Sequence, residues 1–166
     1  MSIKDWIFAL RLHQWTKNIL VFVPLILSHR LENIEDSLTV FMAFFVFGLV
    51  ASANYLINDM VDIDSDRKHL TKKNRPLASG KLSMRNAVIA VIMLLLGAIS
   101  FIFILPLIFF GALATYLTIS ILYSLVLKQI VLLDVIVLAG LYTMRIISGA
   151  LVIKTIPTIR EIRPDQ

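Results

Sequence analysis

The sequence NDMVDIDSDRKHLTKKNRPLASGK, from Asn58 to Lys81, is the one strongly polar stretch of an otherwise apolar chain. It begins with four carboxylates within eight residues, which are Asp59, Asp62, Asp64 and Asp66. Six basic residues follow at once, which are Arg67, Lys68, Lys72, Lys73, Arg75 and Lys81. Acidic side chains this close repel one another unless a cation neutralises them. The stretch therefore predicts a charged site at the end of an apolar helix.

Helical spacing indicates which of these carboxylates can share a cation. At about 100° per residue, Asp59, Asp62 and Asp66 fall within about 60° of one another, whereas Asp64 points away. Three oxygen ligands on one face suit a hard divalent cation such as Mg²⁺, which prefers to be shared with substrate phosphates. The basic residues downstream are natural partners for those phosphates. The alternative is a solvated loop whose basic residues only fix the orientation of the chain in a membrane.

Composition places the chain in a membrane. Of its 166 residues, 58% are hydrophobic and only 16% are charged, with a mean hydropathy of +0.86. A soluble domain of this size cannot bury so much apolar surface, so we expect the bilayer to be the solvent for most of it. The net charge is +5, but the basic residues flank apolar runs, which favours membrane orientation and phosphate binding over nucleic acid. The absence of cysteine excludes disulfides, thiolate ligands and a cysteine nucleophile.

The apolar runs predict an all-α fold, a polytopic transmembrane helical bundle of about five spans. An amphipathic helix over residues 3–15 should lie along the membrane interface before the first span. The expected spans are residues 16–31, 38–57, 84–105, 107–127 and 130–153. Pro24 should kink the first of them. Residues 1–153 then form a single membrane domain, and residues 154–166 form a polar tail.

Charge asymmetry predicts the orientation of the bundle. Residues 67–85 contain seven Lys or Arg and no acidic residue, so the positive-inside rule places this loop in the cytoplasm. The N-terminus, two spans earlier, is then cytoplasmic as well. The short acidic loop over residues 29–37 suits the opposite side. We therefore expect an integral, multi-pass protein of the cell's inner or plasma membrane.

Polar residues in or beside the expected spans are candidates for binding a substrate, because a polar side chain facing lipid is costly. These candidates are Lys17, Asn54, Asn58, Tyr123, Lys128, Asp134 and Arg145. Asn54 precedes Asn58 by one helical turn, so both can face the interior of the bundle. Tyr123 shares a helix face with Tyr116 and Ser120, and we expect that face to turn inward.

Three of these candidates have simpler explanations. Plain interfacial anchoring is the alternative for Lys17 and Tyr123. Asp134 and Arg145 lie about 16 Å apart on one helix, so they do not pair and each needs a different partner. A structural counter-charge is therefore the alternative for Arg145.

The polar stretch also carries a family resemblance. NDMVDIDSD, through Asn58, Asp59, Asp62 and Asp66, matches the NDxxDxxxD signature of the UbiA superfamily of intramembrane prenyltransferases. Four further segments resemble one branch of it, the polyprenyl-phosphate (decaprenyl-phosphate) phosphoribosyltransferases; they are RLHQWTKN, DRKHLTKKNRPLASG, LYSLVLK and LDVIVLAGLYTMRIISGA. The resemblance covers residues 10–150.

This resemblance implies a Mg²⁺-dependent membrane transferase whose donor substrate carries a diphosphate. It implies that Asp59, Asp62 and Asp66 hold Mg²⁺ and act in catalysis. Lys72, Arg75 and Lys17 then stabilise the charge of the departing diphosphate. Lys72 and Arg75 complete the expected catalytic set. In the phosphoribosyltransferase branch the donor is phosphoribosyl diphosphate, and the acceptor is a polyprenyl phosphate held in the bilayer. The alternative within the family is transfer of a polyprenyl group to an aromatic acceptor.

The superfamily bundle has about nine helices and a second acidic cytoplasmic loop, so the chain resembles the N-terminal half of such a bundle. We expect from this that the chain is truncated, that it inserts into membranes, and that a restored C-terminal half is needed for transferase activity. An inactive fragment is one alternative. Another is a membrane protein that binds a metal–phosphate ligand without chemistry.

The orientation is testable with a single cysteine, because the chain has none of its own. With Asn74→Cys in the basic loop, a membrane-impermeant thiol reagent should label the protein only from the cytoplasmic side. Labelling is measured in intact cells and in inverted vesicles. Labelling from the outside would reverse the whole topology.

Overall fold

The computed structural model describes residues 2–126 and 130–153, and every regular element within them is a helix. Four helical segments are long and apolar enough to cross a membrane. They are α3 (Ile34–Val61), α5 (Met84–Ile99) with its 3₁₀ extension η3 (Ser100–Phe103), α6 (Leu107–Leu125) and α7 (Val131–Val152). The short elements are α1 (Ile3–Ala9), η1 (Leu12–Phe22), α2 (Val23–Leu27), α4 (Ile63–Lys68) and η2 (Lys72–Asn74). The prediction of an all-α transmembrane bundle is thus confirmed.

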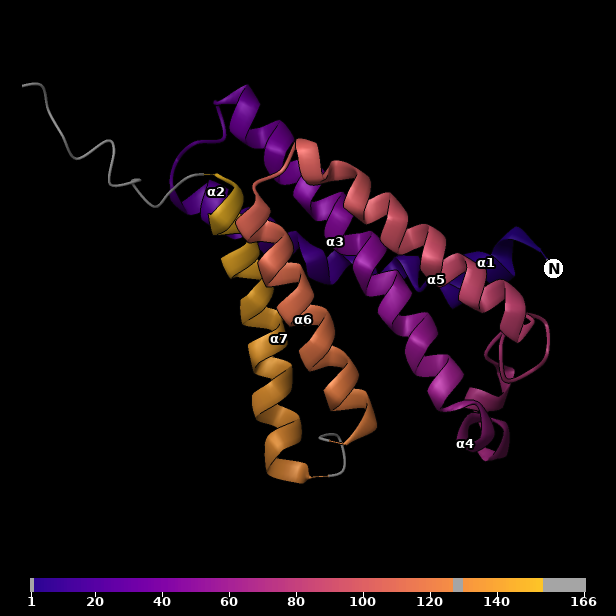
Figure 1. Ribbon diagram of the computed structural model, residues 1–166. Helices are drawn as coiled ribbons and strands as arrows, with labels where there is room; N and C mark the ends of the chain where they lie inside the picture. Colours follow the sequence, from indigo (N-terminus) through magenta and orange to yellow (C-terminus); the bar gives the residue numbers. More distant parts are fainter. Residues whose placement is uncertain (1, 127–129, 154–166) are drawn as a thin grey trace, which may run out of the picture.

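Helix α3 is the central element of the bundle. It packs against η1, α5, α6 and α7, and its membrane-spanning part is more buried than that of any other described helix. The antiparallel pairs α3–α5 and α6–α7 lie close together near α2 and diverge toward the end that carries α4 (Figure 1). This arrangement places the polar stretch at the end where the two pairs are furthest apart.

Local sequence explains why α3 begins and where it runs. Asn33 caps its N-terminus by accepting a hydrogen bond from the backbone N–H of Asp36 at 3.1 Å. The negative charges of Glu35 and Asp36 in the first turn interact favourably with the partial positive charge at the N-terminus of the helix. The helix has 28 residues and is about 42 Å long, so it exceeds the hydrocarbon thickness of a bilayer. It therefore extends about a turn beyond the expected span at each end and includes Asn58 and Asp59.

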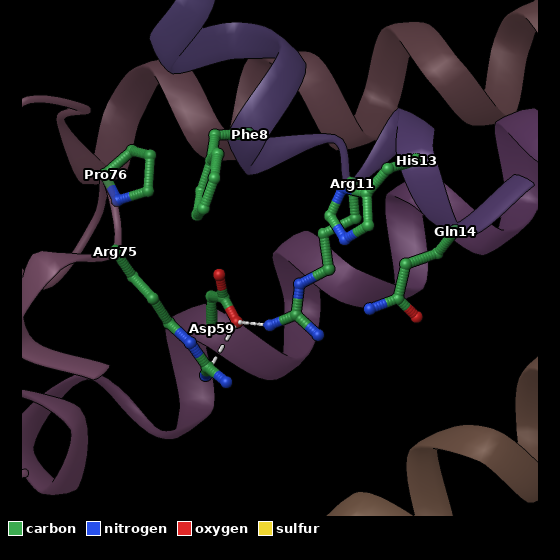
Figure 2. Close-up of a pocket in the computed structure, with 7 residues that line it drawn as sticks. All are labelled: Phe8, Arg11, His13, Gln14, Asp59, Arg75 and Pro76. Atoms are coloured by element: carbon green, nitrogen blue, oxygen red, sulfur yellow. Dashed lines mark hydrogen bonds and ion pairs between the residues drawn. The ribbon is translucent and has the colours of Figure 1, made fainter. Parts of the chain in front are cut away.

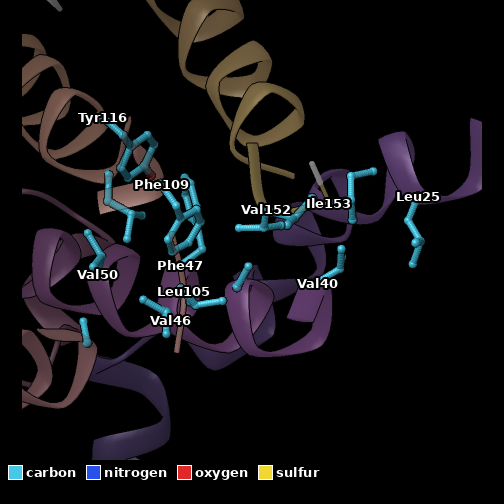
Figure 3. Packing of buried hydrophobic residues seen from close by; sticks show 14 of the residues in the cluster. Leu25, Val40, Val46, Phe47, Val50, Leu105, Phe109, Tyr116, Val152 and Ile153 are labelled. Atoms are coloured by element: carbon cyan, nitrogen blue, oxygen red, sulfur yellow. The ribbon is translucent and has the colours of Figure 1, made fainter. Parts of the chain in front are cut away.

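Two clusters of buried apolar residues hold the bundle together. The larger one joins η1, α2, α3, α6 and α7 around Phe47, Phe109 and Tyr116 (Figure 3). The smaller one joins α1, α3, α5 and the polar loop around Leu56, Leu77 and Leu82. The second cluster fixes the loop after α4 against the end of α3, and so it positions the charged residues of that loop.

The expected first span over residues 16–31 is not a continuous α-helix. The amphipathic helix ends at Ala9 rather than near residue 15, and the chain then forms the 3₁₀ helix η1 and the short helix α2. Pro24 lies in the first turn of α2, where it begins a helix instead of kinking one. Together η1 and α2 extend for about 30 Å, because a 3₁₀ helix rises about 2.0 Å per residue. Four of the expected five spans are therefore found as long helices in the described residues.

The 3₁₀ geometry of η1 has a clear structural effect. With three residues per turn, Trp15, Asn18 and Val21 stack in one row. Trp15 donates a hydrogen bond from Nε1 to Ser52 Oγ on α3 at 3.0 Å, and Val21 is fully buried. All three residues of the row therefore face the bundle. In an α-helix, with 3.6 residues per turn, residues spaced three apart drift around the helix axis and do not stay in one row.

Local sequence also explains the turn before α5. Ser83 caps α5 by accepting from the backbone N–H of Asn86 at 3.2 Å. Gly80 has φ +79°, a left-handed conformation that the turn before α5 requires. The expected membrane domain of residues 1–153 and the polar tail of residues 154–166 stay predictions, since the tail lies outside the described residues.

Gly149 is where α7 and η1 approach most closely, and this gives a test of the fold. A Cβ added there would collide with the backbone carbonyl of Val21, at 2.9 Å from the carbonyl carbon. Gly149→Ala should therefore lower the free energy of unfolding by about 1–3 kcal/mol, because backbone atoms cannot rotate away. SDS-induced unfolding in mixed micelles measures the loss.

Gly140→Ala on the same helix is the matched control, because nothing lies within 4 Å of the added Cβ. Alanine there should leave stability unchanged or raise it by about 0.5–1 kcal/mol. Equal stability of the two variants would contradict the close packing of α7 on η1.

Candidate functional site

The acidic motif lies where α3 ends and α4 begins. Helix α3 ends at Val61, and Asp62 joins it to α4 with φ −89° and ψ 7°. The motif is therefore not one continuous helix, and the expectation that a single helix face carries its carboxylates is wrong in that respect. The bend still buries Asp59 and Asp66, which are 4% and 2% exposed. Asp64 points into solvent as expected, with 87% of its side chain exposed.

Arg75 bridges the two buried carboxylates. Its Nη1 lies 3.1 Å from Asp59 Oδ1 and 2.7 Å from Asp66 Oδ2. Pro76, which is buried, fixes the backbone directly after it. A buried carboxylate is costly unless it is paired and hydrogen-bonded. Arg75 thus supplies the charge that allows Asp59 and Asp66 to face the protein interior.

Arg11 is a second cation at the same place. Its Nη2 donates to Asp59 Oδ1 at 2.6 Å, so Asp59 receives two guanidinium groups on one oxygen (Figure 2). Arg11 itself has φ 49° and ψ 45°, a left-handed conformation that is uncommon for a side chain of this size. Its guanidinium also stacks on the ring of Tyr55, 4.8 Å from the centroid. The turn between α1 and η1 therefore aims this side chain at the carboxylates.

A cavity of about 200 Å³ lies at this charged cluster (Figure 2). It is lined by Phe8, Arg11, His13, Gln14, Asp59, Arg75 and Pro76. Two guanidinium groups and one carboxylate face it, and Asp66, which is not in the lining, offsets part of the charge of Arg75. Such a cavity suits a phosphate group, which arginine recognises through paired hydrogen bonds. We refer to it as the Arg11–Arg75 cavity.

The expected Mg²⁺ ligands do not converge in this arrangement. Among the described residues, no three acidic or histidine side chains lie close enough to hold a metal ion. The donor set itself fits, because carboxylate oxygens are the ligands Mg²⁺ prefers, and Asn58 Oδ1 is buried without a hydrogen-bond partner. A cation between Asp59 and Asp66 requires the Arg75 guanidinium to leave at least one of them. The assignment of Asp59, Asp62 and Asp66 as metal ligands stays a prediction.

A second cavity of about 150 Å³ lies between α3, α6, α7 and η1. Its polar lining residues are Gln14, Lys17, Asn54, Tyr55, Asn58, Tyr116, Ser120, Tyr123, Tyr142 and Arg145. Five of the seven predicted substrate-binding residues are thus brought together here. Gln14 lines both cavities, so the two are neighbours. We refer to this one as the Lys17–Arg145 cavity.

The remaining predicted residues are less closely gathered. Asp134 accepts a hydrogen bond from the hydroxyl of Tyr123 at 2.5 Å, which places it beside the Lys17–Arg145 cavity. Lys72 is exposed in η2 and lines neither cavity. Lys128 lies outside the described residues.

Arg145 and Asp134 have separate partners, as their spacing predicts. Arg145 is 5% exposed and donates from Nε to Asn18 Oδ1 at 3.0 Å and from Nη2 to the Tyr116 hydroxyl at 3.0 Å. Asn54 donates from Nδ2 to Ser120 Oγ at 2.7 Å, which joins α3 to α6. The inward orientation predicted for the face with Tyr116 and Ser120 is confirmed by their burial.

Sequence reasoning missed Arg11, His13, Gln14, Tyr55 and Tyr142 as residues of the site. Arg11, His13 and Gln14 stand in the segment RLHQWTKN, which was used for the resemblance but not for the site. The available signal was a basic residue placed before an apolar run, in a chain with a cluster of four acidic residues. It did not identify Asp59 as the partner, because the two residues are 48 positions apart.

A family profile and several known proteins match most of this chain. The profile of the UbiA prenyltransferase family matches residues 19–159. The uncharacterized protein y4nM of Sinorhizobium fredii is 40% identical over 147 residues, which cover 89% of this chain and 28% of the relative. The nodulation protein NoeC of Azorhizobium caulinodans is 37% identical, over 86% of this chain and 46% of the relative.

A third relative has an enzymatic name. The decaprenyl-phosphate phosphoribosyltransferase of Mycobacterium tuberculosis is 32% identical over 150 residues, which cover 88% of this chain and 50% of the relative. This chain therefore spans half or less of the length of these three relatives.

The bridge formed by Arg75 can be tested through stability. Arg75→Gln should lower the free energy of unfolding by about 1–3 kcal/mol, because it leaves two buried carboxylates with less compensating charge. Combining it with Asp66→Asn should recover part of the loss, with a coupling energy of about 0.5–3 kcal/mol in a double-mutant cycle. SDS-induced unfolding of the four proteins measures these values.

Arg67→Gln is the control for loss of an arginine from the same region. Arg67 lies 3.9 Å from Asp64, and both side chains are more than half exposed. Its removal should cost at most about 1 kcal/mol. If the changes in unfolding free energy caused by Arg75→Gln and Asp66→Asn simply add in the double variant, the two side chains do not interact.

Proposed function

Because the chain belongs to the UbiA prenyltransferase family, we propose that it is a membrane transferase that acts on a diphosphate-bearing donor at the α4 end of the bundle. The Arg11–Arg75 cavity is the observation that carries this proposal. It combines two guanidinium groups with a buried carboxylate beside an all-oxygen donor set. The activity of these relatives does not extend directly to this chain, because the chain spans only half or less of their length.

The chemistry required at this place is the departure of a diphosphate. When the bond to the diphosphate breaks, its negative charge rises, and fixed cations stabilise that charge most effectively when they are already in position. Arg11 and Arg75 are held in place by Asp59 and Asp66 before any ligand arrives. Asp59, Asp62 and Asp66 would hold the Mg²⁺ ion, which neutralises diphosphate charge when bound. Lys72 in the neighbouring loop adds a mobile cation.

We propose phosphoribosyl transfer as the reaction. A phosphate oxygen of a polyprenyl phosphate would bond to the anomeric carbon of phosphoribosyl diphosphate, and the bond from that carbon to the diphosphate would break. The similarity to the Mycobacterium tuberculosis phosphoribosyltransferase supports this choice, because it extends over 88% of this chain. The polyprenyl lipid lies in the bilayer, and the donor enters from the cytoplasmic side, where the basic loop is expected. Nucleic acid has no part in this proposal.

The second candidate function is transfer of a polyprenyl group to an aromatic acceptor. One observation favours it, which is that four tyrosines line the Lys17–Arg145 cavity and offer faces for an aromatic ring. In that reaction prenyl diphosphate is the donor, and it would leave its diphosphate at the same two arginines. The charged cluster serves both reactions, so the identity of the donor must be tested directly.

A labelled-donor assay distinguishes these reactions. Membranes that contain the chain, with and without the C-terminal half of the Mycobacterium tuberculosis relative supplied in trans, receive Mg²⁺, polyprenyl phosphate and one labelled donor. Label from phosphoribosyl diphosphate should enter the lipid fraction. Label only from prenyl diphosphate, entering an aromatic acid, would support the second function instead. No transfer from either donor in both membrane preparations would contradict the proposal.

Three aspartate variants give the assay its residue-level control. Asp59→Asn and Asp66→Asn should reduce transfer at least about a hundredfold, because each removes a proposed Mg²⁺ ligand and a carboxylate that holds Arg75 in position. Asp64→Asn should be mild, since its side chain is 87% exposed and faces away. Equal losses of transfer activity in all three variants would show that the buried residues Asp59 and Asp66 matter no more than the exposed Asp64.

A further inference from the structure

We propose that the Lys17–Arg145 cavity is a separate binding site for a phosphate monoester, the head group of the lipid acceptor. This inference rests on the function proposed above, since it names the place of the second substrate. The cavity is bounded by four elements, η1, α3, α6 and α7, and it shares Gln14 with the Arg11–Arg75 cavity. Two anions bound in the two cavities would therefore be neighbours.

The charge of the lining residues favours an anion. Lys17 and Arg145 carry two positive charges, and none of the described lining residues carries a carboxylate. Asp134 lies beside the cavity, where its Oδ1 accepts from the Tyr123 hydroxyl. Among the described residues, no ion pair involves Arg145, although its side chain is almost fully buried. A permanently charged guanidinium without a counter-ion in the interior is costly, and a bound phosphate would offset that cost.

Arg145 is held rigidly and still has donors to offer. Three of its five N–H groups are used, by Asn18, by Tyr116 and by the backbone carbonyl of Leu141. Three aromatic rings surround its guanidinium, with the rings of Phe47, Tyr116 and Tyr142 at 5.4, 5.1 and 5.3 Å. The Tyr116 hydroxyl accepts from Arg145, so its own O–H is free to donate. Two N–H groups and one hydroxyl thus remain for a ligand.

Unsatisfied polar atoms in the cavity point to a polar occupant. Asn54 is 3% exposed, and its Oδ1 has no hydrogen-bond partner in the described structure. The Oδ1 of Asn58, which also lines the cavity, is likewise buried and unpartnered. Each oxygen needs a donor, and the P–O–H group of a singly protonated phosphate monoester provides one. All four tyrosines of the chain line this one cavity, although the hydroxyls of Tyr55 and Tyr123 already donate to Gln14 and Asp134.

The position of the cavity also suits a lipid-borne group. Lys17 is exposed at its edge, where its Nζ donates to Gln14 Oε1 at 3.0 Å. On α7, Leu138 and Leu141 give the cavity an apolar side. A prenyl chain continues along such a side toward the bilayer, while the phosphate stays with the cations. A volume of about 150 Å³ accommodates the phosphate group itself.

Arg145 also ties α7 to η1 and α6, so its substitution tests binding and folding together. Lys17 separates the two effects, because it is exposed and makes one described side-chain contact, with Gln14. Loss of Lys17 should therefore change ligand binding without changing stability. Lys73→Gln removes the same charge from an exposed residue that lines neither cavity, and it serves as the matched control.

The experiment measures binding to the full chain in nanodiscs of phosphatidylcholine. The probes are a short-chain polyprenyl monophosphate, the corresponding polyprenol, inorganic phosphate and Mg²⁺-diphosphate. The monophosphate should bind at least about tenfold more tightly than the polyprenol. Lys17→Gln should weaken monophosphate binding about tenfold and leave Mg²⁺-diphosphate binding within about twofold. Lys73→Gln should change neither, and Arg145→Lys should weaken monophosphate binding in parallel with Lys17→Gln.

Each contrary outcome has a distinct meaning. Equal binding of monophosphate and polyprenol, or no effect of Lys17→Gln, would overturn the anion site and leave Arg145 as a structural tie. Loss of Mg²⁺-diphosphate binding in Lys17→Gln would show that the two cavities hold one ligand. Inorganic phosphate binding as tightly as the lipid monophosphate would overturn the assignment to a lipid. Binding is measured without turnover, so this test can succeed or fail independently of the transfer assay.

Discussion

The bridge from Arg75 to Asp59 and Asp66 is the interaction on which the polar end of the bundle depends. It crosses from the loop before α5 to the end of α3 and to α4, and so it connects three parts of the chain with one side chain. Arg11 adds the turn after α1 to the same cluster. Removing Arg75 from this arrangement leaves carboxylates in the protein interior with less opposing charge, which low-dielectric surroundings penalise strongly. Residues 75–78 of the charged loop are therefore part of the packed structure, whereas residues 67–74 are exposed to solvent.

A second arginine plays a comparable part inside the bundle. Arg145 joins α7 to Asn18 of η1 and to Tyr116 of α6, with residues that are 127 and 29 positions away in the chain. Polar groups within a membrane bundle must find partners in the protein, because lipid offers none. The two arginine-centred clusters border neighbouring cavities that meet at Gln14. This adjacency is what a transfer reaction between two anionic substrates requires.

The chain belongs to the UbiA prenyltransferase family, and the proposed transfer reaction assigns one substrate to each of the two cavities. The carboxylates and arginines at the end of α3 suit the diphosphate leaving group of the proposed donor, whereas the Lys17–Arg145 cavity suits the phosphate of the proposed acceptor. In the described structure Arg75 takes the place between Asp59 and Asp66 that a divalent cation would share. In the proposed reaction, Mg²⁺ binding between these carboxylates requires Arg75 to leave at least one of them, and the freed guanidinium can then bind a donor phosphate.

The sequence by itself determined the membrane setting and the positions of α3, α5, α6 and α7, because these follow from local composition. The cap at Ser83 and the inward face of Tyr116 likewise follow from local spacing. It also indicated most of the candidate site, since Asp59 and Arg75 belong to the charged stretch, and Asn54 and Arg145 are polar residues within apolar spans. Only the tertiary structure decided the partners. The 3₁₀ geometry of η1 is stabilised by contacts with α3 and α7, and a local 3.6-residue pattern does not reveal it. The pairing of Arg11 with Asp59 and of Arg145 with Asn18 depends on how closely distant helices approach, and that is set by packing over the whole bundle.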